Sequence, residues 1–430
     1  MSEDRSAAED RRSTGGWFAG AGLGLFVHWD HASQQGLEIS WPLVGGNFAL
    51  PQGQSVSVEQ YHSSAATFDP TAWDAGALAR LARDTGATYA VLTTKHHSGY
   101  AMFHTKLSEF SVEHSPFGRD IVREFVDAVR AEGLRVGLYF SLPDWSAPDY
   151  PAFTEADKPY RFGYSPPVPG PERWDRYLEY LFGQITELLT QYDQIDVLWF
   201  DGGWERAAAQ WRGGELIDLI HSLQPDILVN DRLPGFGDYE TPEQFVPARP
   251  LGRAWETCMT MNESWGYNPT DTHYKSARHL IHSLCEVAGR GGNLLLNVSP
   301  RGDGSLPPEQ VERLQVLGEW MRAHGESITG TTAGLEPWQF YGPSTRRGDR
   351  IYLHLLMRPY DSVTVRGVPI RRVQAVRAIA TGTELNRTTR TGIIDSLTED
   401  PHGELTIEVP ADLLDANATV LAVEFSPAGS

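Results

Sequence analysis

Cysteine is scarce in this chain, and so are the long apolar segments that mark secreted or membrane proteins. Two cysteines in 430 residues, Cys258 and Cys285, are too few for a disulfide framework or a four-thiolate zinc site. We therefore predict two buried free thiols in preference to a single disulfide. No apolar run approaches the ~18 residues of a membrane span, and the N-terminal MSEDRSAAEDRRSTGG has no apolar signal-peptide core. These absences predict a cytoplasmic protein without a membrane partner.

Basic residues are also few. The chain has 36 Lys and Arg against 56 Asp and Glu, which gives a formal net charge of −20 at pH 7. Binding to nucleic acid or to an anionic membrane needs clustered Lys and Arg, because the phosphate groups are negative. The composition therefore predicts no nucleic-acid partner and disfavours a polyanionic substrate, whereas a neutral sugar fits.

Aromatic residues, in contrast, are abundant: 13 Trp, 16 Tyr and 17 Phe. Pyranose rings have apolar C–H faces that stack on aromatic rings, so this richness suits an enzyme that acts on sugars. A large core together with a second domain explains the same composition equally well, and a chain of 430 residues favours two domains.

Apolar runs alternate with amphipathic stretches through about the first 330 residues. Strands are predicted at 22–29, 89–97, 134–141, 195–202, 226–232, 254–260 and 292–299, and helices at 73–85, 120–132, 174–192, 215–223, 274–287 and 308–323. Continuously apolar strands separated by helices are typical of a parallel sheet covered on both faces. At least seven such units, without a GxGxxG or GKS/GKT loop, favour an α/β fold with a (β/α)8-like TIM barrel over a doubly wound sheet.

The pattern changes after Gly330. Short segments such as IYLHLLMRP, SVTVRGV and ATVLAVEFSP alternate apolar and polar residues between Gly, Pro, Asn and Asp turns. This alternation predicts a C-terminal antiparallel β-sandwich. The predicted organisation is a disordered N-terminus at 1–15, a (β/α)-barrel catalytic domain at 16–335 and the β-sandwich at 336–430.

Polar residues collect where the predicted strands end. In a barrel of this type the C-terminal ends of the strands meet at one mouth. The residues at those ends are His28, Trp29, Lys95, His96, His97, Tyr139, Asp144, Trp145, Trp199, Asp201, Asn230, Asp231 and Arg232. The sequence therefore predicts one ligand pocket, and its residue types suit a neutral polyol.

Asp201 is the most informative of these residues. It ends the apolar run VLWFDGG, and the two glycines after it leave room for a ligand. A carboxylate held there can attack an anomeric carbon or act as a general base, unless it only caps the next helix. Glycoside hydrolysis needs a second carboxylic acid. Glu243 is the first candidate for this acid, and Glu240 and Glu256 are the alternatives. The other interpretation of a Glu in a long loop is a solvated side chain without a catalytic role.

The histidines allow two interpretations. His96 and His97 point to opposite faces of a regular strand, although a twisted strand end brings both to one ligand. As metal ligands they would need partners such as His28 and His31, but HWDH is not a spacing of the HExxH type. We expect a neutral imidazole that donates to a sugar hydroxyl, and therefore no metal and no cofactor. Arg232 either binds hydroxyls, orients a carboxylate or forms an ordinary ion pair.

Several longer motifs occur in a fixed order over about residues 15–335: GLGLFVHW, LTTKHHSGYAMFHTKLSEFSV, GRDIVREFVDAVRAEGLRVGLYFSLPDW, VLWFDGGW, VNDR, WETCMTMNESWGY and GRGGNLLLNVSPRGDGSLPP. In sequence and order they resemble the retaining α-L-fucosidases of the glycoside hydrolases (family 29 type). The resemblance implies a barrel with a second β domain, and release of terminal α-L-fucose through a covalent fucosyl-enzyme.

The resemblance also implies roles for single residues. Asp201 matches the family's nucleophile, and Glu243, in a TPE loop, matches the acid/base of one branch. The residues that match fucose-binding or pocket positions are His28, His96, His97, Tyr139, Trp199 and Arg232. The chain departs from the family at Asp30, where members often have Gly, and in the following loop, where Glu38 and Trp41 stand in for the Glu and Trp of a GEWY-like pattern.

Two rival functions stay open at this point. A metal-dependent amidohydrolase-type barrel enzyme also places His and Asp at its strand ends, and a non-catalytic sugar-binding protein needs the same pocket. The predicted partner is a fucosylated oligosaccharide or glycoconjugate, and homo-oligomerisation is left open.

Overall fold

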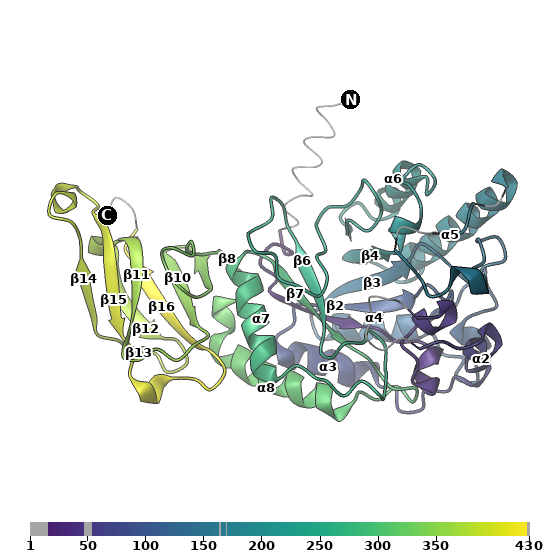
Figure 1. Ribbon diagram of the computed structural model, residues 1–430, viewed down its shortest axis with the longest axis horizontal. Helices are drawn as coiled ribbons and strands as arrows, with labels where there is room; N and C mark the ends of the chain where they lie inside the picture. The colour runs from purple at the N-terminus through teal and green to yellow at the C-terminus, as the bar shows by residue number, and fades with distance from the viewer. Residues whose placement is uncertain (1–15, 47–53, 163–164, 169, 428–430) are drawn as a thin grey trace.

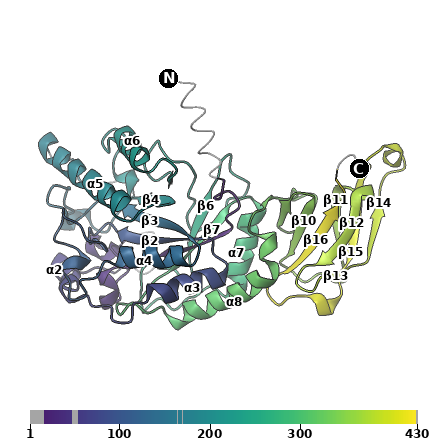
Figure 2. The ribbon, with the colours of Figure 1, turned by 180° about the vertical axis from the view of Figure 1, so that it is seen from behind.

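A computed structural model describes residues 16–46, 54–162, 165–168 and 170–427. The predicted disordered N-terminus at 1–15 lies outside these residues. Figure 1 shows a parallel sheet with flanking helices at one end of the molecule and antiparallel strands at the other, with helices α7 (Ala277–Gly289) and α8 (Pro308–His324) between them. The view from behind shows the same order of layers (Figure 2).

The parallel sheet has seven strands in the order β5-β4-β3-β2-β1-β7-β6 among the described residues. Their bounds are β1 (Leu23–Val27), β2 (Tyr89–Lys95), β3 (Arg135–Ser141), β4 (Val197–Asp201), β5 (Leu228–Val229), β6 (Glu256–Thr260) and β7 (Asn293–Val298). Each lies within a predicted strand, and nearly all their side chains are buried. Burial on both faces explains why these segments are continuously apolar.

The predicted helices are present as well. They are α3 (Ala75–Thr85), α4 (Ile121–Ala131), α5 (Pro171–Gln191), α6 (Gly213–Leu223), α7 and α8, and a short helix α2 (Val58–Ser63) was not predicted. Asp74 and Asp120 cap α3 and α4 by accepting hydrogen bonds from backbone N–H groups of the first turn. These caps fix where each helix begins after its strand.

The sequence predicted a closed (β/α)8-like barrel. The described residues form a curled parallel sheet of seven strands, and this sheet is the part of the prediction that the structure bears out. β5 and β6 do not pair with each other as strands. The segment 239–243 lies between them and makes single parallel bridges, Asn230 with Tyr239, Glu240 with Trp255 and Glu243 with Cys258. Pro242 interrupts this segment and has no N–H to donate, so a regular ladder does not form there.

The antiparallel part, which we call the C-terminal β domain, consists of a six-stranded sheet in the order β13-β12-β16-β10-β9-β8 and a three-stranded sheet in the order β11-β15-β14. The bounds are β8 (Thr332–Ala333), β9 (Ser344–Arg347), β10 (Arg350–Leu355), β11 (Ser362–Pro369), β12 (Val373–Ala378), β13 (Thr383–Glu384), β14 (Arg387–Arg390), β15 (His402–Glu408) and β16 (Thr419–Phe425). Both sheets contribute to one apolar core that includes Leu353, Val365 and Leu405. The boundary at residue 335 stays a prediction.

Two expectations about the whole chain can be compared with the structure. Cys258 and Cys285 are free and buried, as predicted. Over the described ranges, no helix combines the length and the apolar character that crossing a membrane requires.

Candidate active site

A cavity of about 320 Å³ opens at the carboxyl ends of the parallel strands. It is lined by Phe26, His28, Trp41, His96, Tyr139, Phe162, Trp199, Asp201, Trp204, Arg232, Glu243, Cys258 and Trp265. Eight of these side chains belong to the predicted site: His28, Trp41, His96, Tyr139, Trp199, Asp201, Arg232 and Glu243. The convergence of strand ends on one pocket is thus present in the structure.

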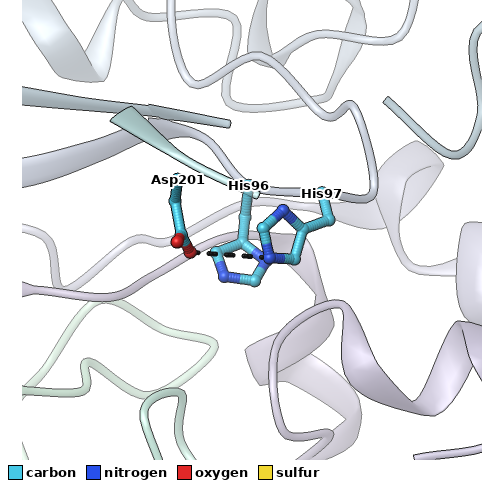
Figure 3. A group of neighbouring side chains, drawn as sticks. All are labelled: His96, His97 and Asp201. Atoms are coloured by element: carbon cyan, nitrogen blue, oxygen red, sulfur yellow. Dashed lines mark ion pairs between the residues drawn. The ribbon is translucent and has the colours of Figure 1, made fainter. Parts of the chain in front are cut away.

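Asp201 ends β4 and is turned toward the two adjacent histidines (Figure 3). Its Oδ2 accepts a hydrogen bond of 2.8 Å from the Tyr139 hydroxyl and lies 3.5 Å from His97 Nε2. Its Oδ1 accepts no hydrogen bond from the described residues, and Arg232 Nη1 lies 3.6 Å away. Oδ1 itself is buried, and each carboxylate oxygen lies beside a protein donor, Oδ2 beside Tyr139 and Oδ1 beside Arg232, while 14% of the side chain is exposed.

The two glycines after Asp201 allow close approach around it. Gly202 has φ +74°, a left-handed conformation that strains other residues, and a Cβ there would overlap Pro143. A Cβ at Gly203 would overlap the carbonyl oxygen of Arg232. The DGG sequence therefore brings the chain after β4 against the chain after β5, which places Asp201 beside Arg232.

The protonation of Asp201 depends on its neighbours. Burial raises its pKa above the ordinary value, and the Arg232 guanidinium and the Tyr139 hydroxyl counteract part of that rise. The Tyr139 hydroxyl stays protonated, because burial and the Asp201 carboxylate hold its pKa well above the usual range. Tyr139 is thus a fixed donor to Asp201.

Arg232 lies between the two candidate catalytic carboxyl groups. Its Nη2 donates to Glu243 Oε2 at 2.8 Å, while its Nη1 is on the side of Asp201. Burial lowers the pKa of Arg232, but Glu243 and Asp201 outweigh that effect and hold it above its ordinary value. A permanently charged guanidinium therefore joins the two acids.

The loop that carries Glu243 is held by the residues after β5. Asp231 accepts hydrogen bonds from the backbone and side chain of Thr241, and Arg232 Nε donates to Thr241 Oγ1 at 2.9 Å. Gln244 N donates to the Cys258 carbonyl of β6 at 2.9 Å. These contacts fix both ends of the short segment that brings Glu243 to the cavity.

The alternatives to Glu243 do not line this cavity. Glu240 pairs with Arg253 at 3.2 Å on the outside, with 37% of its side chain exposed. Glu256 is fully buried below the cavity, where it accepts a 2.8 Å hydrogen bond from Trp199 Nε1 and another from the Tyr89 hydroxyl. Of the three candidates, the geometry favours Glu243.

Each predicted histidine of the pocket has one ring nitrogen tied to the protein. His28 Nδ1 is 2.7 Å from Asn297 Oδ1, His96 Nδ1 is 2.7 Å from Ser40 Oγ, and His97 Nδ1 is 2.6 Å from Ser141 Oγ. Burial lowers the pKa of His28 and of His97 to about 3 and that of His96 well below its usual value. These lowered pKa values keep all three rings neutral at pH 7. His28 and His96 line the cavity, whereas His97 does not, and its buried Nε2 lies 3.5 Å from Asp201 Oδ2.

A metal-binding arrangement was also tested against the structure. His96, His97 and Asp201 each have one ligand atom within 4.8 Å of the others, so this set could hold an ion. His31, the further partner considered from the sequence, instead pairs with Ser64 at 2.8 Å outside the cavity. A second set, Glu263, Asp271 and His273, has two exposed members and lies away from the cavity-lining residues.

The two residues proposed from the weakly matching loop have different positions. Trp41 lines the cavity. Glu38 does not: it is buried and accepts hydrogen bonds from the backbone N–H groups of Trp265 and Gly266. Burial raises the pKa of Glu38 to about 7. Glu38 therefore positions the loop that brings Trp265 to the cavity, and the Glu38 side chain is not itself among the cavity-lining residues.

Sequence reasoning missed five lining residues: Phe26, Phe162, Trp204, Cys258 and Trp265. Phe26 and Cys258 are strand residues that looked like core. Trp204 and Trp265 lie in the quoted motifs VLWFDGGW and WETCMTMNESWGY, so proximity to a strand end was an available signal. Phe162 lies in an irregular segment with no such signal. Asn230, expected at the pocket, instead makes two hydrogen bonds to the Phe200 backbone.

Known proteins share both the sequence and the fold. The sequence profile of the family described as alpha-L-fucosidase matches residues 2–326. An alpha-L-fucosidase of Dictyostelium discoideum is 29% identical over 83% of this chain and 80% of its own. The structure of alpha-L-fucosidase isoenzyme 1 from Paenibacillus thiaminolyticus has a TM-score of 0.84 at 33% identity, covering 98% of this chain and 100% of that one. A GH29 alpha-L-fucosidase from Bacteroides thetaiotaomicron, trapped as a covalent intermediate with 2-fluoro-fucosyl fluoride, has a TM-score of 0.79 at 25% identity over 95% of both chains.

Proposed function

The chain belongs to the α-L-fucosidase family, a family of glycoside hydrolases, and we propose that it removes terminal α-L-fucose from fucosylated oligosaccharides or glycoconjugates with retention of configuration. In this proposal Asp201 is the nucleophile and Glu243 is the acid/base. The observation that carries it is the pair of carboxyl groups on either side of one guanidinium, with both side chains lining the cavity. The trapped intermediate of the Bacteroides relative supports a covalent route.

In the first step the Asp201 carboxylate forms a bond to C1 of fucose while the bond from C1 to the leaving oxygen breaks. The Glu243 carboxyl gives its proton to that oxygen. Tyr139 donates to Asp201 Oδ2, and this hydrogen bond fixes the orientation of the carboxylate. The side chain of Glu243 is 39% exposed, which gives it access to a proton from solvent.

In the second step the ionised Glu243 takes a proton from water, and the water oxygen attacks C1 and displaces Asp201. The guanidinium of Arg232 stabilises Glu243 in this ionised state and Asp201 as it leaves. Neutral His28 and His96 bind fucose hydroxyls, and neutral His97 lies beside Asp201, so none of the three adds charge beside the sugar cation that develops.

The experiment is turnover of an aryl α-L-fucoside, with the first-formed anomer identified by NMR. Asp201→Gly should lower kcat/KM by about 10⁴-fold or more, and azide should restore turnover as β-L-fucosyl azide, because azide takes the place of the nucleophile. Glu243→Ala with azide should give the α-azide, because azide then attacks the β-linked enzyme ester. Release of β-L-fucose first by the wild type would contradict the retaining mechanism.

The matched control for Glu243→Ala is Glu240→Ala, which removes the neighbouring exposed acid outside the cavity. It should hydrolyse the aryl fucoside like the wild type. If Glu240→Ala loses deglycosylation while Glu243→Ala keeps it, the acid/base assignment is wrong.

The set His96, His97 and Asp201 also permits a test of the metal-dependent alternative. The amidohydrolase reading is not supported by family membership. We expect fucoside hydrolysis to be unchanged after prolonged treatment with a chelator and gel filtration. Loss of activity that zinc restores would show that the three side chains hold a required ion.

Three further predictions stay proposals. The bridges of segment 239–243 support a barrel that this segment completes between β5 and β6. Two buried free thiols suit the predicted cytoplasmic location. Sedimentation of the purified protein measures whether it forms a homo-oligomer.

A further inference from the structure

The cavity has two aromatic regions that differ in exposure. Its inner part is formed by Phe26, Tyr139, Trp199 and Trp265, all at most 7% exposed and packed in one cluster inside the parallel sheet. Its mouth is formed by Phe162, which is 47% exposed, and Trp204, which is partly exposed, and the buried Trp41 packs edge-on against Phe162. A sugar held against Asp201 fills the inner part, so the rings at the mouth face whatever is attached to that sugar.

The Arg232 guanidinium lies between the inner rings and the mouth, 5.4 Å from the ring centre of Trp199 and 5.9 Å from that of Trp204, and it also donates to Glu243. Glu243 protonates the leaving oxygen in the proposed mechanism, so a leaving group that extends from the cavity past Arg232 meets the rings at the mouth. Phe162 and Trp204 have ring centres 5.3 Å apart, and they provide two neighbouring apolar faces there.

These rings are held by a buried carboxyl group that the catalytic mechanism does not use. Glu205 is 6% exposed and accepts hydrogen bonds from Trp145 Nε1 at 3.1 Å, from Tyr160 Oη at 3.0 Å and from the Tyr150 hydroxyl. Tyr160 in turn accepts a 2.7 Å hydrogen bond from Trp204 Nε1. Glu205 therefore fixes Tyr160, and Tyr160 fixes the plane of Trp204.

The electrostatics of the mouth suit a neutral ligand. The charge of Arg232 is offset by Asp201 and Glu243, and the nearby His97 is neutral because burial lowers its pKa to about 3. A charged leaving group would gain no unpaired partner among these lining residues. A pyranose, in contrast, can place an apolar C–H face on an aromatic ring while its hydroxyls stay in water.

We propose that Trp204 and Phe162 form an acceptor subsite that binds the leaving group as a neutral pyranose stacked on the Trp204 ring, with Glu205 as the positioning residue for that ring. This inference rests on the proposed function, since it assumes that the inner cavity holds fucose. The enzyme then recognises the sugar to which fucose is attached, through Trp204 and Phe162, as well as fucose itself.

The test compares two substrates that share fucose and differ in the leaving group. One is α-L-fucosyl fluoride, whose leaving group is too small to reach the mouth. The other is a fucosyl-galactose or fucosyl-N-acetylglucosamine disaccharide, in the linkage that the wild type hydrolyses fastest. Trp204→Ala should lower kcat/KM for the disaccharide about 5- to 10-fold more than for the fluoride, mainly through KM, because one aromatic contact is lost.

The ratio of the two kcat/KM values is the deciding quantity, because a partly unfolded preparation lowers both values equally. Trp338→Ala removes a 75% exposed tryptophan of the C-terminal β domain and is the matched control, which should change neither value. Equal losses on both substrates in Trp204→Ala would overturn the subsite. No release of fucose from either substrate by the wild type would instead overturn the proposed function.

Glu205→Gln tests the positioning role. Gln has the shape of Glu, but its amide nitrogen donates and cannot accept a hydrogen bond. One of the hydrogen bonds that Glu205 accepts is therefore lost, and the arrangement of Trp145, Tyr160 and Trp204 loosens. We expect KM for the disaccharide to rise several-fold with a smaller effect on the fluoride, as in Trp204→Ala. A double variant, Glu205→Gln with Trp204→Ala, should be no worse in this ratio than Trp204→Ala alone. An additive loss would show that Glu205 does not act through Trp204.

Discussion

The carboxyl end of the parallel sheet and the C-terminal β domain differ in where they keep ionisable side chains. Around the sheet the buried ones include His28, Asp30, His31, Glu38, Lys95, His96, His97, Asp144, Glu205, Arg206, Glu256 and Asp271. Within the described part of the C-terminal β domain, His354 alone among the acidic, basic and histidine side chains is buried. The ion pairs of this domain, such as that of Arg366 with Glu404 at 3.2 Å, lie on the surface.

The difference follows from what each region does. A buried carboxyl or imidazole costs stability in its charged form, and each one needs hydrogen bonds from its neighbours. The site contains such groups despite that cost, because the proposed hydrolysis needs neutral histidines, a fixed carboxylate and a permanently charged guanidinium. The β domain has no such requirement, so its core is apolar and its surface pairs contribute little. Changes of the same chemical kind should therefore have unequal effects in the two regions.

The largest difference is expected for arginine. Arg232→Met should lower kcat/KM for an aryl fucoside about 100-fold, because Asp201 and Glu243 lose the charge between them. The pKa of Asp201, already raised by burial, should rise further without Arg232. Activity needs ionised Asp201, so the acidic limb of the pH profile should move to higher pH. The measurement is kcat/KM against pH.

The matched change in the β domain is Arg366→Met, whose partner is the exposed Glu404. It should leave the pH profile unchanged and alter unfolding free energy by less than about 0.5 kcal/mol. An acidic limb that moves to lower pH in Arg232→Met would contradict the role given to this guanidinium.

The next difference is expected for glutamate. Burial raises the pKa of Glu256 to about 7, from 4.5. The folded state therefore favours the neutral form, and its stability falls as pH rises from about 4.5 to 7. Glu256→Gln does not titrate, and its amide can still accept from Trp199 and donate to Tyr89. Relative to the wild type it should gain on the order of 2 kcal/mol of unfolding free energy between pH 5 and pH 8.

Urea unfolding at the two pH values measures this gain. Glu404→Gln, the control in the β domain, should show a pH-dependent difference below about 0.5 kcal/mol. If both variants respond equally to pH, burial of Glu256 is not the cause.

The smallest effect is expected for the one buried histidine of the β domain. Burial lowers the pKa of His354 to about 3, so the folded state favours the neutral ring and loses stability as pH falls below about 6.5. His354→Leu should keep on the order of 1–2 kcal/mol that the wild type loses between pH 7.5 and pH 5. The exposed His402→Leu is the control for urea unfolding at these pH values. If His354→Leu loses as much unfolding free energy as the wild type over this pH range, His354 is not the cause of the loss.

Much of the first region could be predicted from local patterns. The strands are short apolar runs, and the residues at their carboxyl ends meet wherever a parallel sheet is formed, so the convergence of His28, His96, Asp201 and Arg232 followed from order alone. Glu38 was misplaced because its loop matched only weakly, and whether a loop carboxyl faces the cavity or backbone N–H groups depends on packing. The closed barrel was predicted from the number of units, but the described strands form a sheet of seven whose edge strands β5 and β6 are linked only by single bridges of an irregular segment, and no local pattern predicts such bridges.

The amino-acid order by itself determined the elements, the family and the place of Asp201 at the end of a strand, because these are encoded in contiguous residues. Only the tertiary structure shows that Glu243, and neither Glu240 nor Glu256, lines the cavity beside Arg232. It also decided that Trp204 and Phe162 lie together at the mouth, because the hydrogen bonds of Tyr160 with Glu205 and Trp204 join two segments that are far apart in the chain. Distances between segments far apart in the chain arise from packing, and no local pattern contains them.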